Sequence, residues 1–246
     1  FSDATNAASD YASEIASYNN NGFTTVSSGA AYNNVNGQEY ASWTFRKAPK
    51  FFDVVTYTGT PDGDKTISHS LNTTVGMAII KRYDHAGYDW HVYHTSRGTN
   101  KYLLLNGTNA EASGSIVTAT SNTSITLSQS NGFNTSGATY VVYLFAHNNS
   151  DGEFGPDSDQ DIIKCGSYTG NGTDARTINL GFEAQWLLVK RSDGQTDWWI
   201  VDNMRGLHAR QVSGNYLEAN TGNAEASQGN FFADSQGFMV DAGDYN

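Results

Sequence analysis

Residues 76–106 read GMAIIKRYDHAGYDWHVYHTSRGTNKYLLLN, and this stretch decides the fold class. It holds three short runs of apolar and aromatic residues, at 77–82, 90–94 and 102–105. Gly, Asp, Asn and Ser residues separate the runs at intervals of roughly 10–15 residues, a spacing typical of strands joined by turns. Further runs of this kind lie on both sides, at 51–57, 124–127 and 140–145, and helical periodicity is weak. The pattern predicts an all-β protein of the sandwich or barrel type.

The chain repeats itself with an offset of about 110 residues. The segment Asn-Ala-Glu-Ala-Ser occurs at residues 109–113 and again at 223–227. Small insertions in loops explain why the offset drifts along the chain. Other landmarks recur in the same order: Lys81-Arg82 with Lys190-Arg191, Asp89-Trp90 with Asp197-Trp198, Arg97-Gly98 with Arg205-Gly206, Asn106 with Asn220, and Tyr57-Thr58-Gly59 with Tyr168-Thr169-Gly170.

The first fifty residues resemble the later part of the repeat. Residues 37–45 match residues 137–145, which close the complete copy, so we expect a strand at 40–45. We therefore divide the chain into the C-terminal part of a preceding β-repeat, a complete β-sandwich repeat, an acidic linker, and a second repeat that lacks its last strand. The boundaries are 1–49, 50–148, 149–161 and 162–246. On this interpretation the sequence is a piece of a longer polypeptide.

Composition narrows the functional classes. The chain carries 14 Lys and Arg against 25 Asp and Glu, a formal net charge of −11. Phosphate backbones and anionic membranes attract clustered basic residues, so we expect neither nucleic-acid binding nor membrane insertion. No stretch approaches 18 apolar residues, which excludes a transmembrane helix. One cysteine, Cys165, can form neither an intrachain disulfide nor a CxxC metal site.

Residues 41–53 read ASWTFRKAPKFFD and are followed by VVTYTG at 54–59. This segment resembles a repeat family found in tail fibres and tail spikes of marine bacteriophages. The resemblance extends over nearly the whole chain. Its other parts are an apolar run ending in Lys-Arg, a Trp strand, a Tyr-Leu-x-x-Asn strand and a closing strand, at 77–82, 90–93, 102–106 and 140–147, with 162–170 and 198–202 in the second copy.

The resemblance implies a structural and adhesion segment of a phage tail appendage. Such a protein is extracellular on the virion, contacts other phage tail proteins, and binds the bacterial surface, with glycan as the expected receptor. The resemblance also implies concanavalin-like or SPRY-like jelly-roll sandwiches and a homotrimer, and it brings no catalytic residues.

Two other function classes stay open. One is a glycan-depolymerising tail spike that uses paired Asp or Glu side chains, which a groove lined with carboxylates would favour. The other is a carbohydrate-binding module array, or another virion or extracellular filament component, which a flat aromatic platform would favour. No His pattern predicts zinc and no G-x-S-x-G elbow is present, so the protein is expected not to be an enzyme.

Three tryptophans are candidates for glycan binding, because an indole face can stack on a sugar ring. Trp90 and Trp198 each open a strand, and Trp199 follows on the opposite face of that strand. The competing interpretation is that a Trp at a strand start packs in the sandwich core, and for Trp90 and Trp198 we favour it.

Arg97 and Arg205 are candidates for binding an anionic sugar or carboxylate with two parallel N–H groups. The competing interpretation is an ion pair with a neighbouring carboxylate such as Asp89 or Asp202, next to a glycine in a left-handed turn. We favour the ion pair, because a specific site seldom needs duplication in tandem copies.

The linker at 149–161 is acidic and is a candidate calcium site. Oxygen ligands at such spacing can hold Ca²⁺, which takes about 6–8 of them, but the EF-hand order is absent. A solvated, charged linker is the favoured alternative, and no other cofactor is expected. The candidate ligands are Asp151, Glu153, Asp157, Asp159 and Asp161.

Overall fold

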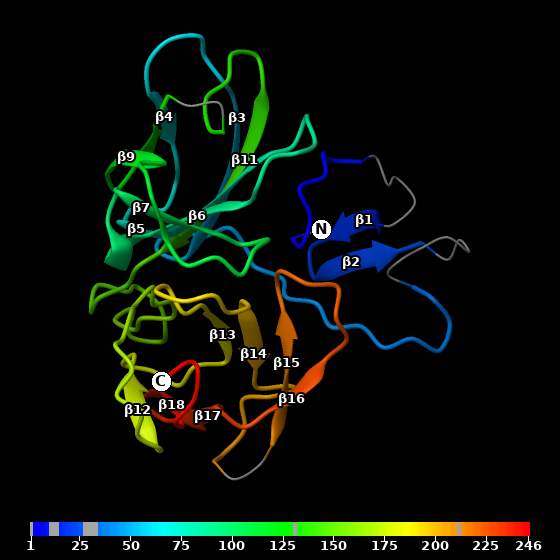
Figure 1. The fold of residues 1–246 in the computed structure, drawn as a ribbon, viewed down its shortest axis with the longest axis vertical. Helices are drawn as coiled ribbons and strands as arrows, with labels where there is room; N and C mark the ends of the chain where they lie inside the picture. The colour runs from blue at the N-terminus through cyan, green and yellow to red at the C-terminus, as the bar shows by residue number, and fades with distance from the viewer. Residues whose placement is uncertain (1, 10–14, 27–33, 130–131, 211–212) are drawn as a thin grey trace. The chain divides into compact units, whose positions relative to one another are not determined.

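The computed structural model describes residues 2–9, 15–26, 34–129, 132–210 and 213–246 (Figure 1). In these residues the regular structure consists of antiparallel strands and one 3₁₀ turn, η1 (Thr95–Arg97), with no α-helix. The all-β prediction is confirmed. The chain forms two compact units, Ala8–Arg46 and the combination of Phe1–Ala7 with Lys47–Asn246. No helix in the described part of the chain is long and apolar enough to cross a membrane.

The smaller unit contains one hairpin, in which β1 (Ile15–Asn19) pairs with β2 (Gly22–Thr25). The turn consists of two asparagine residues, which tolerate turn conformations well. The prediction of a strand at 40–45 is wrong, because residues 34–46 contain none. In the complete repeat the matching strand is hydrogen-bonded on both sides, and the described residues of the smaller unit provide no such neighbours.

The complete repeat consists of two antiparallel sheets (Figure 1). The larger sheet has the strand order β3-β11-β5-β6-β7-β8, and the smaller sheet has the order β4-β10-β9. The bounds are β3 Phe52–Thr58, β4 Lys65–Ser68, β5 Val75–Arg82, β6 His91–His94, β7 Lys101–Leu104, β8 Ala112–Ser113, β9 Val117–Thr120, β10 Ser124–Leu127 and β11 Thr139–Ala146.

The core of this repeat lies between the two sheets. In β10, Ile125 and Leu127 are buried and alternate with more exposed residues, as expected for a strand with one face on the core. They join Ile80 and Val142 from the larger sheet in one cluster of buried side chains. Burying an aliphatic side chain of this size contributes about 1.5–3 kcal/mol. The sandwich is therefore held together by apolar packing across the two sheets.

The second repeat has the same strand orders as the first. Its sheets are β12-β18-β17 and β13-β14-β15-β16, which correspond to β4-β10-β9 and β5-β6-β7-β8. The repeated sequence landmarks therefore occupy equivalent places in two similar frameworks. The bounds are β12 Arg176–Asn179, β13 Trp186–Val189, β14 Trp199–Asp202, β15 Gly214–Glu218, β16 Ala226–Gln228, β17 Phe231–Asp234 and β18 Gly237–Val240.

The two repeats differ at the segment that corresponds to β3. Residues 162–170 contain no strand, although their sequence matches that of β3. In the first repeat β3 is an edge strand whose neighbour in the sheet is β11. The described residues of the second repeat contain no counterpart of β11, so the segment has no strand with which to pair.

The recurring Tyr-Thr-Gly landmark holds this segment in place in the absence of strand pairing. Tyr168 Oη donates to the carbonyl of Tyr245 at 2.5 Å. A Cβ atom on Gly170 would lie 2.3 Å from the carbonyl carbon of Asn246, so only glycine allows this approach. In the first repeat, a Cβ atom on Gly59 would likewise meet a backbone oxygen, at 2.0 Å.

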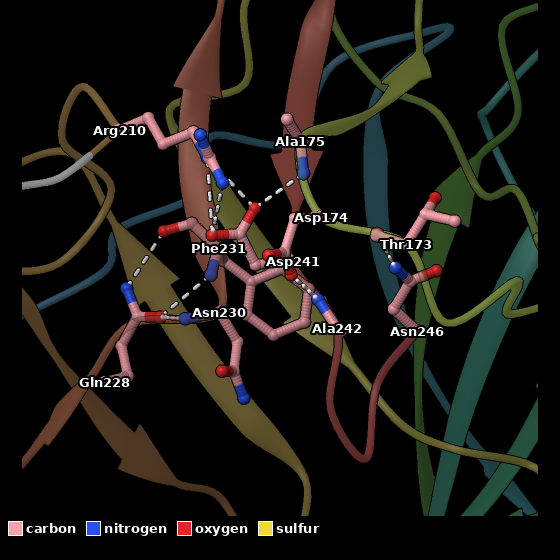
Figure 2. A network of polar contacts seen from close by, with 10 residues as sticks. All are labelled: Thr173, Asp174, Ala175, Arg210, Gln228, Asn230, Phe231, Asp241, Ala242 and Asn246. Atoms are coloured by element: carbon pink, nitrogen blue, oxygen red, sulfur yellow. Dashed lines mark hydrogen bonds and ion pairs between the residues drawn. The ribbon is translucent and has the colours of Figure 1, made fainter.

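A polar network ties together the strand ends of the second repeat's smaller sheet (Figure 2). Arg210 Nε lies 3.0 Å from Asp241 Oδ1, and the same oxygen accepts from the amide of Ala175 at 2.6 Å. Gln228 Oε1 accepts from the amide of Phe231 at 2.8 Å. Two of these bonds satisfy backbone amides where strands begin, at the exposed Ala175 and at the buried Phe231.

Candidate functional site

The Asp-Trp and Asn landmarks of each repeat form one hydrogen-bonded clamp. Asn106 Oδ1 accepts from the amide of Trp90 at 2.8 Å, and Asn106 Nδ2 donates to Asp89 Oδ1 at 2.8 Å. The corresponding Asn220 makes the same two bonds to the Asp-Trp pair of the second repeat, each at 2.7 Å. The clamp fixes the position of each tryptophan relative to the loop that contains the asparagine, after β7 in the first repeat and after β15 in the second.

A lysine beside each clamp reaches a backbone carbonyl outside its own repeat. Lys81 is 3% exposed, and its Nζ donates to the carbonyls of Thr5 at 3.2 Å and Tyr88 at 2.5 Å. Lys190 Nζ donates to the carbonyl of Thr108, also at 3.2 Å, as well as to oxygens of its own loop. Both threonines precede an Asn-Ala pair, so the two contacts are equivalent by sequence.

Backbone bonds reinforce this contact in the same way in both places. The carbonyl of Thr5 accepts from the amide of Gly87 at 2.9 Å, and the carbonyl of Thr108 accepts from the amide of Thr196 at 3.1 Å. At the second place the amide of Glu111 also donates to a carbonyl of the next repeat, at 2.7 Å. In both places a repeat thus binds a loop that precedes it in the chain.

We call this contact the repeat joint. In the first joint the acceptor loop is residues 2–7 and the donor face is Lys81 with Trp90. In the second joint the acceptor loop is residues 104–112 and the donor face is Lys190 with Trp198. Residues 2–7 belong to the same compact unit as the two repeats, so both joints lie within one unit.

The indole N–H groups complete the donor faces. Trp198 is 3% exposed, and its Nε1 donates to the carbonyl of Leu104 at 2.8 Å. Trp90 is half-buried, and its Nε1 donates to the carbonyl of Ala4 at 3.1 Å. Its ring also stacks on Tyr143 with a centroid distance of 6.3 Å. Two of the three tryptophans predicted as glycan candidates thus contact the acceptor loops.

The lysines of the joint sit in a poorly solvated environment. Burial lowers the pKa of Lys190 to about 8, and the nearby Asp197 carboxylate opposes this shift. Burial also lowers the pKa of Lys81, with Asp89 acting in the opposite direction. Carbonyl oxygens bind each ammonium group, as a buried charge requires.

The two repeated arginines form ion pairs. Arg97 binds Glu111 through two hydrogen bonds, of 2.6 and 2.8 Å, and this bonding lowers the pKa of Glu111. Arg205 lies 2.8 Å from Asp202 and 2.7 Å from Glu225. The partner of Arg97 is therefore the glutamate of the Asn-Ala-Glu-Ala-Ser segment rather than the aspartate that the sequence suggested. The Arg-Gly and Asn-Ala-Glu-Ala-Ser landmarks thus recur together because their arginine and glutamate bind each other and stabilise the acceptor loop.

The glycines that follow these arginines are required for different reasons. Gly98 has a φ of 72°, a conformation that favours glycine, as predicted. Gly206 is not in a positive-φ conformation, which corrects the prediction for this copy. A Cβ atom on Gly206 would instead lie 1.8 Å from the carbonyl oxygen of Asn215, so the two backbones meet directly.

Trp199 packs within the second repeat. Its ring stacks on Tyr216 with a centroid distance of 3.9 Å and lies beside Phe231 and Tyr245. It is half-buried against the core cluster of this repeat.

The most exposed aromatic side chain among the described residues lies in the smaller unit, where the sequence analysis had placed no candidate. Tyr18 is 81% exposed and Phe23 is 40% exposed, and the two face each other across the hairpin. They border a shallow groove lined by residues 18–23 with Ser42, Thr44 and Arg46. Aromatic rings, amide groups and a guanidinium are the groups that bind saccharides. The consecutive asparagines were the sequence signal for this groove.

The carboxylates of the acidic linker bind nearby backbone amides and a lysine. Asp161 accepts from the amides of Ser150 and Gly152 at 2.8 and 2.7 Å. Lys50 Nζ lies 3.0 Å from a carboxylate oxygen of Glu153. Within the described residues no three His, Cys, Asp or Glu side chains gather where they could hold a metal ion. The other acidic residues of the linker are Asp151, whose carboxylate accepts an amide at 2.9 Å, and the exposed Asp157 and Asp159.

Fold and joint together define a protein of tandem all-β repeats, each bound to its neighbour through a lysine and an indole. The chain belongs to the family described as a domain of unknown function, DUF7483, whose model matches residues 1–246. No curated protein and no solved structure matches the chain significantly.

Proposed function

We propose that this protein is a structural and adhesion segment of a bacteriophage tail fibre or tail spike, exposed on the virion and in contact with the bacterial surface. The observation that carries the structural role is the repeat joint, which occurs twice with a lysine and an indole as donors and backbone carbonyls as acceptors. Copies linked through contacts of the same kind can be added in series, as in other repeat proteins. The phage assignment rests on the motif at residues 41–59.

For adhesion, we propose that the groove of the smaller unit contacts a surface glycan. The exposed ring of Tyr18 can stack on a sugar, and the asparagine amides beside it can bond to hydroxyl groups. Arg46 adds a preference for acidic sugars, because a guanidinium binds carboxylates through paired N–H groups.

The proposed role is non-catalytic. A glycosidase needs one carboxyl group whose pKa is raised so that it can act as an acid. Arg97 instead lowers the pKa of Glu111, and Asp202 and Glu225 are held by Arg205. These carboxylates brace a loop, which is a structural use.

The proposed assembly is a homotrimer that also contacts other tail proteins. Closed cyclic association is the usual way for identical chains to bury a common surface. The mass of the protein in light scattering at micromolar concentration tests this part, and a monomeric mass would contradict it.

Electron microscopy of phage particles labelled with an antibody against the protein tests the assignment to the tail. Label on tail appendages supports the proposal, and label confined to the head contradicts it. Glycan binding is tested with purified protein and host-surface polysaccharide. Tyr18→Ala should weaken binding about tenfold or more, while Tyr40→Ala, an exposed tyrosine outside the groove, should leave it unchanged. Release of oligosaccharide from the polysaccharide would favour the depolymerase instead.

A further inference from the structure

Among the described residues, the acceptor loop of the second repeat is the one acceptor loop to which no donor face is bound. The donor face of the first repeat binds residues 2–7, and the donor face of the second repeat binds residues 104–112. The remaining acceptor loop is residues 218–226. By sequence, Glu218 corresponds to Leu104 and Gly222 corresponds to Thr108.

This loop is built in the same way as the occupied one. Asn220 clamps the Asp-Trp pair beside it, just as Asn106 does in the first repeat. Glu225 is bound by Arg205, just as the first repeat's glutamate is bound by its arginine. Two side chains of the loop, Asn220 and Glu225, are therefore held by contacts equivalent to those of the occupied loop.

The two loops differ in what covers them. Residues 110–112, next to the second repeat, are half-buried, whereas residues 224–226 are exposed. The amide of Glu111 donates to a carbonyl of the following repeat, and among the described residues no backbone partner of this kind is found for Glu225. Among the described residues the segment 2–7 contacts this loop from outside the repeat: Ser2 Oγ donates to the carbonyl of Ala219 at 2.6 Å, and Asp3 Oδ2 lies 3.6 Å from where a Cβ atom on Gly222 would stand, so deleting the segment uncovers the loop fully.

We propose that residues 218–226 are the docking surface for the donor face of a third β-repeat of the same type. The lysine ammonium of that repeat binds the carbonyl of Gly222, and its indole N–H binds the carbonyl of Glu218. The carboxylate of Glu218, which is bound by the neutral groups of Thr221 and Asn223, adds a negative charge to this surface that attracts the ammonium. This inference goes beyond the proposed function, because it depends on the joint alone and holds whether or not the protein belongs to a phage.

The chemistry specifies the occupant. It must present a lysine and a tryptophan eight or nine residues apart, as Lys81 and Trp90 or Lys190 and Trp198 do, and both must be free. An intact second copy of this chain does not qualify, because its own loops already occupy both of its donor faces. The occupant is therefore a repeat whose donor face is uncovered.

The protein itself supplies the probe. Deleting residues 1–7 uncovers Lys81 and Trp90, so the shortened chain carries both a free donor face and a free acceptor loop. We expect it to associate head to tail at micromolar concentrations, about 100 μM or below, beyond any association of the intact chain. Sedimentation velocity measures the mass distribution of both chains.

Two substitutions in the shortened chain locate the contact. Gly222→Arg places a bulky cation on the acceptor loop and should weaken the additional association at least tenfold, as should Lys81→Met on the donor face. Gly229→Arg is the matched control. Gly229 is exposed, and a Cβ atom there would meet nothing within 4 Å, so the association should remain.

The proposal is overturned if the folded, shortened chain sediments like the intact chain, or if its association is insensitive to Gly222→Arg. If circular dichroism shows that this deletion unfolds the protein, the same series is run on a chain that lacks only residues 1–5. The shorter deletion removes the acceptor carbonyls of Ala4 and Thr5 and keeps Asn6 and Ala7, and the same outcomes support or overturn the proposal.

Discussion

Replacing Trp198 by phenylalanine should weaken the joint between the two repeats by a predictable amount. The substitution removes the bond from Nε1 to the carbonyl of Leu104, which is 2.8 Å long. That carbonyl also accepts from the amide of Gly107 at 3.2 Å, so it is not left without a donor. The lost bond therefore costs its net value, about 0.5–1.5 kcal/mol. The smaller ring at a site that is 3% exposed costs about 1–1.5 kcal/mol more in apolar burial and packing.

The free energy of unfolding should thus fall by about 1.5–3 kcal/mol, measured by urea titration followed by circular dichroism. Trp90→Phe is the matched control, since that indole is half-buried and its bond to Ala4 is longer, at 3.1 Å. It should cost about 1 kcal/mol or less. A loss below about 0.5 kcal/mol for Trp198→Phe, or a larger loss for Trp90→Phe, would refute the reasoning.

Three further predictions concern packing, reactivity and pH. Gly206→Ala should cost about 3 kcal/mol or more by thermal or urea unfolding, because the new Cβ would lie 1.8 Å from a backbone oxygen, whereas Gly229→Ala should change stability by less than about 0.5 kcal/mol. The Cys165 thiol is buried and its pKa is raised to about 12, so a disulfide reagent at neutral pH should label it only in urea, and rapid labelling of the native protein would contradict this. Burial lowers the pKa of His94 to about 4, below its value of about 6.5 in the unfolded chain. The unfolded state then binds more protons between these values, so stability should fall by about 1–3 kcal/mol as the pH drops from 7 to 4, and His94→Gln should flatten this dependence.

The sequence predicted the strands well where the strands have partners in the described chain. The run at 124–127 coincides with β10, because alternating apolar residues and flanking turn residues determine a short strand locally. The strand expected at 40–45 is absent, and residues 162–170 do not repeat β3. A strand exists only when a neighbour satisfies its backbone groups, and that condition is not visible in the segment itself.

The repeated landmarks were found from the sequence, but the reason for their repetition was not. Lys190 and the carbonyl of Thr108 are 82 positions apart, and a backbone acceptor leaves no signature in the side chains. The prediction of the partner of Arg97 was wrong for a related reason. Its glutamate comes close because β7 and β8 pair, whereas the nearer aspartate is already bound by Asn106.

Amide hydrogen exchange at the two joints tests the central claim most directly. The amides of Gly87, Glu111 and Thr196 lie outside the strands and bond across the joints, so each should exchange about a hundredfold or more slowly than an open loop. In the variant Lys190→Met, Glu111 and Thr196 should lose this protection while Gly87, at the other joint, keeps it. Rapid exchange at Glu111 and Thr196 in the unmodified protein would contradict the joint.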